Sequence, residues 1–332
     1  MEHTKCIDWA SSFLISSGYK IKHEAKLIQA APWSFVWRFE TESGFIYLKK
    51  SIPEFFIETL IIKIIDHVNP DCVPKVIGIN QALHCFLMLD AGVTLRERFK
   101  YQFDADLLTE VIKKYTLLQC ALSEKSDTLI EAGVPDWRLK KFPEFYANLI
   151  ENDLLLDEVG ISCSEKAKLF DLKPRLTEIC ERLSSFKIPE TLDHCDFHDN
   201  NVLYDEKNNQ LTLIDLGEVV VSHPFFPLHS LFFMQQYWDY FKKDDQDYLK
   251  IKDACFYNFR QFESEKHLHE IFELTLLLHP LYYVFSIMRL ITACDREGYK
   301  TNFTGPDGIV KSLQAQKKNI AGCLRQLIEI ES

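Results

Sequence analysis

Residues 192–204 read LDHCDFHDNNVLY, a segment that holds two histidines, one cysteine, three aspartates and two asparagines between apolar flanks. Apolar sequence usually lies in a protein core, where every buried polar group needs a partner. A second acidic segment, LTLIDLGE at residues 211–218, follows shortly afterwards. Together these two segments indicate a functional loop, and the chemistry of that loop decides which fold to expect.

Two simpler hypotheses suit the first segment less well. His194, Cys195 and His198 offer zinc ligands, but structural zinc usually takes four ligands in paired short spacings, and the sequence has no second pair. The asparagines and aspartates suit a surface turn, but the flanks are rich in apolar residues. A metal hydrolase built on the two histidines and nearby aspartates stays open as an alternative.

The spacing has a mechanical meaning in a phosphotransfer loop. Asp196 would accept or orient the proton of a substrate hydroxyl beside a γ-phosphate, and Asn201 would offer its amide oxygen to Mg²⁺. Asp215 ends the next strand-like run, where its carboxylate would bridge the metal ions that hold the β- and γ-phosphates. A hairpin between Asn201 and Asp215 would bring both magnesium ligands to the same end.

The pattern H-x-D-x-H-x-x-N-V-L followed by LIDLGE resembles the aminoglycoside phosphotransferase and choline kinase-like superfamily, which is related to protein kinases. Members typically have H-G-D-hydrophobic-H-x-x-N and then I-D-hydrophobic-G-(D/E), so Cys195 stands where glycine is usual. A conventional protein kinase has arginine between the histidine and the aspartate, and D-F-G downstream. Neither is present here. The resemblance implies an α+β, bilobal protein kinase-like fold.

A kinase-like site also needs a strand lysine for the phosphates and a helix glutamate that orients it. The run GFIYLKKS supplies Lys49 or Lys50, which lie on opposite faces of a strand. The resemblance favours Lys49. In the following helix, Glu58 is expected to face inward, whereas Glu54 in the first turn suits the helix dipole.

Three further nucleotide contacts follow from the resemblance. Backbone groups of Met88 and Asp90, in the connector CFLMLDAG, would bond the edge of adenine. The phosphate-covering loop would be APWSFVWRF, in which Ser34 could bond a phosphate. This loop contains no glycine, which departs from the kinase pattern G-x-G-x-x-G. His194 and His198 are expected to hold the catalytic loop, and the role of Glu218 stays open.

The order of the predicted elements matches this architecture. The first 90 residues alternate between helical and strand-like runs, and the rest is mostly helical apart from a strand pair at 201–205 and 211–216. We therefore expect a nucleotide-binding lobe at residues 1–89, a hinge at 90–93, and a helical lobe at 94–332 that carries the catalytic loop and the acceptor site.

Composition narrows the partners and the compartment. The 332 residues carry a net charge of −11, which disfavours nucleic acid as a partner. The ten cysteines include no C-x-x-C pair, which indicates reduced thiols and a cytoplasmic protein. No membrane span is expected, because the apolar run at 274–288 is short and contains Pro280; a buried helix broken near this proline is expected instead.

The acceptor is expected to be a small molecule. Aromatic and acidic residues are dense in QQYWDYFKKDDQDY (235–248) and ACDREGY (293–299), a composition that suits an amine-bearing alcohol or sugar but also an ordinary helix surface. The sequence thus predicts an ATP- or GTP-dependent, Mg²⁺-requiring phosphotransferase. The alternative is a kinase-like binding protein without turnover (a pseudokinase), but Asp196, Asn201, Asp215 and Lys49 are all present.

Overall fold

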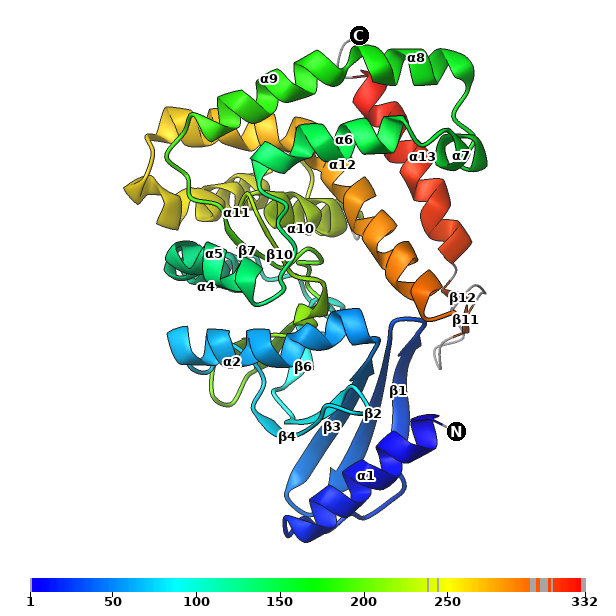
Figure 1. The fold of residues 1–332 in the computed structure, drawn as a ribbon. Coiled ribbons are helices and arrows are strands. Elements are labelled where there is room, and N and C mark those ends of the chain that lie inside the picture. Colours follow the sequence, from blue (N-terminus) through cyan, green and yellow to red (C-terminus); the bar gives the residue numbers. More distant parts are fainter. Residues whose placement is uncertain are drawn as a thin grey trace. The chain divides into compact units, whose positions relative to one another are not determined.

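The computed structural model describes residues 2–237, 239–243, 245–298, 303–304, 310–311 and 313–329. It is mixed helix and sheet, with an antiparallel sheet in the N-terminal part and a larger, mostly helical C-terminal part (Figure 1). The predicted α+β class is therefore confirmed. The chain forms two compact units: unit 1 comprises residues 1–95, 202–218 and 289–315, and unit 2 comprises residues 96–201, 219–288 and 316–332.

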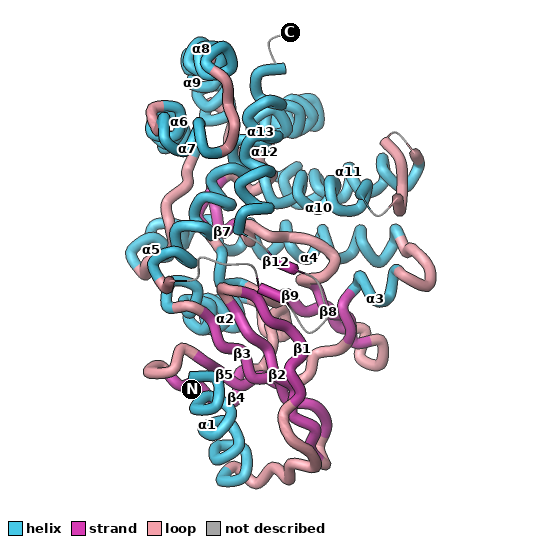
Figure 2. Tube along the Cα trace, turned by 90° about the vertical axis from the view of Figure 1, so that its right-hand side faces the viewer, coloured by secondary structure: helices cyan, strands magenta, loops and turns pink. Residues whose placement is uncertain are grey.

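Unit 1 is built on a five-stranded antiparallel sheet in the order β1-β2-β3-β5-β4 (Figure 2). Its strands are β1 (Lys26–Ala31), β2 (Ser34–Thr41), β3 (Gly44–Ser51), β4 (Val76–Asn80) and β5 (Cys85–Leu89). The runs predicted as strands become β2, β3 and β5. β1 and β4 were not predicted, and β4 is half-buried along its whole length, so it lacks the alternation of buried and exposed residues.

The two faces of this sheet have different roles. Ile46 and Leu48 of β3 pack in a core cluster with Leu14 and other buried residues of α1 (Glu2–Ser16). Because neighbouring residues of a strand point to opposite faces, Tyr47 and Lys49 face away from α1. The alternation in GFIYLKKS thus presents Lys49 on the side of the sheet that α1 leaves uncovered.

The helix predicted from Pro53 onward has two parts. Residues Pro53–Ile57 form a 3-10 turn, η1, and α2 spans Glu58–Val68. Glu58 is therefore the first residue of α2 and does not lie one turn inside a longer helix. It still points inward, since it is only 2% exposed.

Unit 1 also contains a two-stranded sheet of β11 (Phe303–Thr304) and β12 (Val310–Lys311), and a three-stranded sheet in the order β6-β8-β9. The strands of the three-stranded sheet are β6 (Val93–Thr94), β8 (Val202–Asp205) and β9 (Gln210–Leu213). Gly92, which leads into β6, has φ +109°, and a β-carbon added there would lie 2.3 Å from the Tyr204 carbonyl oxygen. Only glycine allows both this backbone conformation and this close approach. Residues Leu216–Glu218 then form a 3-10 turn, η4.

Unit 2 is mostly helical. Its helices are α3 (Leu95–Phe99), α4 (Ala105–Leu122), α5 (Ser126–Glu131), α6 (Phe142–Ile150), α7 (Asp153–Glu158), α8 (Cys163–Asp171), α9 (Lys173–Ser184), α10 (Phe226–Tyr237), α11 (Gln246–Tyr257), α12 (Glu265–Arg296) and α13 (Leu313–Glu329), of which α3 and α13 begin in unit 1 and α12 ends there. The expectation of one strand pair in this half of the chain is wrong, because β7 (Thr191–Asp193) also pairs with β10 (Val220–Ser222). Both strands are fully buried and three residues long, too short for a periodic signal.

Helix α12 corrects a second expectation. It runs unbroken through Pro280, although proline cannot donate to the carbonyl of Leu276 one turn earlier. Leu276 lies on an exposed face of the helix, at 43% exposure. Among the described residues, α12 is also the one helix long and apolar enough to cross a membrane, and half of its most apolar window is buried inside the protein.

Replacing Gly92 with alanine is expected to destabilise the protein by about 3 kcal/mol or more, because the new β-carbon meets the β8 backbone as well as an unfavourable φ. The matched control is Gly44→Ala, where φ is +117° but no atom lies within 4 Å of the added β-carbon. That control should lose only about 1 kcal/mol. Urea unfolding monitored by circular dichroism measures both, and equal losses would contradict the close approach.

Candidate active site

The predicted lysine and its two acidic partners form one cluster within unit 1. Lys49 Nζ lies 2.6 Å from Glu58 Oε2 and 2.6 Å from Asp215 Oδ1. The Lys49 and Glu58 side chains are 6% and 3% exposed, whereas that of Asp215 is 27% exposed. The structure thus brings together three of the predicted site residues, which come from β3, α2 and the segment after β9.

The cluster holds its charges in place by mutual attraction. Burial disfavours the Lys49 ammonium, but the carboxylates of Asp215 and Glu58 outweigh burial and raise the pKa of Lys49 above its usual value. Lys49 therefore stays charged at any physiological pH. Asp215 is the more exposed member of the cluster. A ligand that approaches from this side would meet the fixed Lys49 ammonium with the Asp215 carboxylate beside it.

Backbone geometry fixes Asp215 next to α2. Asp215 has φ +63°, an uncommon conformation for a residue with a side chain. The next amide, that of Leu216, donates a 3.1 Å hydrogen bond to Glu58 Oε1. Glu58 thus bonds Lys49 with one oxygen and the backbone of the Asp215 segment with the other.

Arg289, near the end of α12, ties the same two segments together from another side. Its Nε donates to Glu54 Oε1 at 3.2 Å, and its Nη1 donates to the Glu218 carbonyl at 2.6 Å. Its guanidinium also lies over the Phe55 ring, 5.3 Å from the centroid. Glu54 also accepts from Arg296 Nη1 through Oε2 at 3.1 Å, so its partners are two arginines, where we expected the helix dipole to explain Glu54. The sequence gave only one indication of this role: Arg289 is a single arginine directly after an apolar run.

The predicted catalytic loop lies in unit 2. Asp196 is half-exposed, and Asn201 Nδ2 donates 2.9 Å to Asp196 Oδ2 and 2.8 Å to the Asp196 carbonyl. His198 Nε2 lies 3.3 Å from Asp196 Oδ2. Burial would raise the pKa of Asp196, but His198, together with His194 and the Asn201 hydrogen bond, holds it well below its usual range. Asp196 is thus an ionised carboxylate with a fixed orientation.

Asn201 uses its amide nitrogen for both bonds to Asp196 and is 3% exposed. Its amide oxygen is therefore the atom left for a ligand, and Mg²⁺ prefers oxygen ligands of this kind. Asn201 directly precedes β8, and Asp215 follows β9 by two residues. The register of the two strands pairs Val202 with Leu213.

The remaining predicted contacts lie in or near the sheet of unit 1. Ser34 follows the two-residue turn Pro32–Trp33 between β1 and β2, is 3% exposed, and its hydroxyl has no hydrogen-bond partner among the described residues. Met88 pairs with Tyr47 and Val76. The Asp90 amide donates to the Phe45 carbonyl at 3.3 Å, so that amide is already committed.

No group of three or more metal-ligating His, Cys, Asp or Glu side chains occurs in the described part of the chain. The described residues therefore give no support to the metal-hydrolase alternative. Trp238, Asp244 and Tyr299, which belong to the two stretches suggested for the acceptor, lie outside the described residues.

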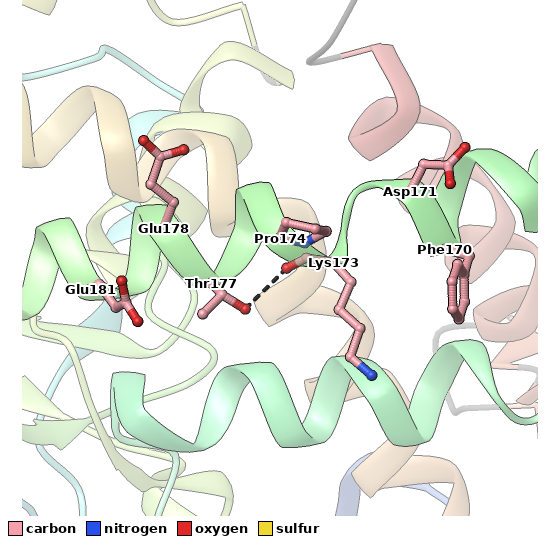
Figure 3. A pocket seen from close by; sticks show the side chains of 7 residues that line it. All are labelled: Phe170, Asp171, Lys173, Pro174, Thr177, Glu178 and Glu181. Atoms are coloured by element: carbon pink, nitrogen blue, oxygen red, sulfur yellow. Dashed lines mark hydrogen bonds between the residues drawn. The ribbon is translucent and has the colours of Figure 1, made fainter.

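A hollow of about 500 Å³ lies along α8 and α9, away from all of these residues in sequence (Figure 3). It is lined by Phe170, Asp171, Lys173, Pro174, Thr177, Glu178 and Glu181. Most of these side chains are exposed, and none is a predicted site residue. The hollow therefore adds nothing to the candidate site.

Comparison with known proteins agrees with the motif. Residues 128–252 match the model of the phosphotransferase enzyme family, a range that contains Asp196, Asn201 and Asp215. No curated protein matches the chain. Over this part of the chain the match agrees with the predicted resemblance to aminoglycoside phosphotransferases.

Solved structures of low sequence identity share the fold. An amicoumacin kinase in complex with AMP-PNP, Ca²⁺ and Ami superposes with a TM-score of 0.58 at 12% identity, covering 96% of this chain and 93% of the other. A choline/ethanolamine kinase family protein from Mesorhizobium loti gives 0.59 at 13%, covering 98% and 95%. The ADP-bound aminoglycoside phosphotransferase APH(2'')-Ib gives 0.56 at 16%, covering 96% and 97%. The kinase-like architecture therefore extends over nearly the whole chain.

Replacing Lys49 with methionine should lower the free energy of unfolding by about 3 kcal/mol, because Glu58 is left buried without its cation. Lys50→Met, on the other face of β3, is the matched control and should cost less than about 1 kcal/mol. Adding Glu58→Gln to Lys49→Met should recover part of the loss. Urea unfolding measures all three variants, and equal effects of the two lysine substitutions would contradict the buried cluster.

Proposed function

We propose that this protein is an ATP- or GTP-dependent phosphotransferase that moves the γ-phosphate to a hydroxyl group of a small molecule. The observation that carries the proposal is the buried Lys49 ammonium held between Glu58 and the more exposed Asp215. A desolvated cation fixed in this way stabilises negative charge far better than a mobile surface lysine. The family match over the catalytic segments supports the same reaction class.

Lys49 would bind nucleotide phosphates, and Glu58 would keep its ammonium in position. Ser34 and the backbone at Met88 and Asp90 would complete the nucleotide contacts. Asn201 and Asp215 would hold Mg²⁺, which supplies positive charge beside the phosphates when it is bound. The donor set suits this ion, since one neutral amide oxygen and one carboxylate are hard oxygen ligands and Mg²⁺ completes its shell with phosphate and water.

Asp196 would orient the acceptor hydroxyl and accept its proton as the oxygen–phosphorus bond forms. Its carboxylate is accessible and ionised, and Asn201 fixes its rotamer. A low pKa suits this role, because phosphoryl transfer depends mainly on positioning and charge stabilisation. His198 would hold the loop through its contact with Asp196 and through Nδ1, which accepts the Asn200 amide at 3.1 Å.

An amine-bearing alcohol or sugar is the acceptor class we propose, in a cytoplasmic setting. The acidic net charge of −11 favours a cationic substrate. Proteins of similar fold include an ethanolamine kinase, a choline kinase and a phosphotransferase in complex with GDP and kanamycin. The competing proposal is a kinase-like protein that binds nucleotide without turnover, and the two experiments below separate the candidates.

Nucleotide binding is tested first. ATP or GTP with Mg²⁺, at 100 times its dissociation constant, should stabilise the wild-type protein by about 2.7 kcal/mol in a thermal-shift experiment. Asp215→Ala should lose the Mg²⁺-dependent part of this shift, whereas Asp8→Asn, an exposed aspartate on α1, should keep it. An absent shift at millimolar nucleotide would sink the proposed function.

Turnover is tested next with Asp196→Asn, which keeps the size and hydrogen-bonding shape of the side chain but cannot take a proton. We expect phosphate transfer to a panel of amino alcohols and amino sugars to fall by about 10²- to 10⁴-fold, with nucleotide binding retained. Mass spectrometry of the acceptor detects the product. Binding without any turnover by the wild-type protein would favour the pseudokinase instead.

A further inference from the structure

Cys195, directly before Asp196, has an unusual backbone conformation. Its φ is +67°, in the left-handed region where a β-carbon is disfavoured, and the residue is only 6% exposed. Glycine adopts this conformation without penalty, and the related motif usually has glycine here. The chain therefore needs another means of holding this turn in front of the catalytic aspartate.

Asp193 supplies the necessary contact from inside the protein. It ends β7, is 0% exposed, and its Oδ1 accepts the Cys195 amide at 2.7 Å. The hydroxyl of Tyr282, from α12, donates to the same oxygen at 2.8 Å. The intervening His194 amide donates to the Tyr115 hydroxyl at 3.0 Å, so buried side chains satisfy both amides that enter the loop.

The cost of keeping this carboxyl group buried indicates a specific role. Oδ2 of Asp193 has no hydrogen-bond partner among the described residues, although it is fully buried. Desolvation raises the pKa of Asp193 to about 7. An apolar residue would suit this strand better on stability grounds alone, so the contribution of Asp193 must come through its bonded oxygen, Oδ1.

We propose that Asp193 is a positioning residue that compensates for the cysteine at position 195: its Oδ1 anchors the Cys195 amide and so holds the left-handed turn that presents Asp196. The inference rests on the proposed function only for its catalytic consequence. If it is correct, the requirement for Asp193 arises from the β-carbon of residue 195 and should disappear when that atom is removed.

The experiment combines Asp193→Ala with two substitutions of the cysteine. Cys195→Gly removes the β-carbon, and Cys195→Ala keeps the β-carbon but removes the thiol, so it is the matched control. Crystal structures give φ at position 195 in each variant without any assumption about function. Measurements are made at pH 8, above the pKa of Asp193.

Asp193→Ala alone, and together with Cys195→Ala, should lose the positive φ at position 195. The combination with Cys195→Gly should keep it, and so should Asp193→Asn, which retains an acceptor oxygen. A positive φ that persists in Asp193→Ala, or the same outcome with glycine and alanine at position 195, would overturn the proposal. If Asp193→Ala does not fold, the same comparison is made with Asp193→Val, because valine suits a buried strand.

The kinetic arm uses Mg-ATP with water as the acceptor. Asp193→Ala should lower kcat by roughly 100-fold, the usual effect of a small misplacement of a catalytic group, and leave KM for ATP unchanged, because Lys49, Glu58 and Asp215 are not altered. Cys195→Gly should restore kcat in this background and Cys195→Ala should not; equal restoration by both would count against the inference. If the wild-type protein hydrolyses no nucleotide, the kinetic arm is run with the amino alcohol and amino sugar panel, and the φ values decide the role of Asp193 in either case.

Discussion

A single buried ammonium organises unit 1. Lys49 on β3 bonds both Glu58 at the start of α2 and Asp215 after β9, so three distant parts of the sequence meet at one charge. The buried Glu58 carboxylate is tolerable only because this cation is present, and the buried cation is tolerable because Glu58 and the more exposed Asp215 both face it. The Leu216 amide on Glu58 and the Arg289 bridge between Glu54 and Glu218 then fix the surrounding backbone.

The protein has residues with a β-carbon at places where the related motifs use glycine. The left-handed turn at Cys195 is held by the Asp193 carboxylate, and the turn between β1 and β2 contains Pro32 and Trp33 in place of a glycine-rich loop. In both places the backbone has fewer accessible conformations than glycine would give it. The local geometry also depends on single partners such as Asp193.

The sequence predicted what short-range patterns can specify. Alternation in SFVWRFET and GFIYLKKS placed β2 and β3, and apolar spacing placed α4. It missed β7 and β10, since three fully buried residues carry no periodicity, and it broke α12 at Pro280 because a local sequence rule cannot tell whether the packing of the whole helix tolerates one proline. Asp193 and Arg289 were missed for a related reason: their partners Tyr282 and Glu54 lie 89 and 235 residues away.

The turn of Pro32 and Trp33 has a consequence for binding entropy. Proline restricts its own backbone, and a chain without glycine has fewer conformations to lose. The conformation of this turn is therefore restricted when the protein folds. Ordering it then takes little from the free energy of ligand binding. A ligand bound at this turn, as proposed for the nucleotide, would therefore meet a backbone with little conformational freedom left to lose.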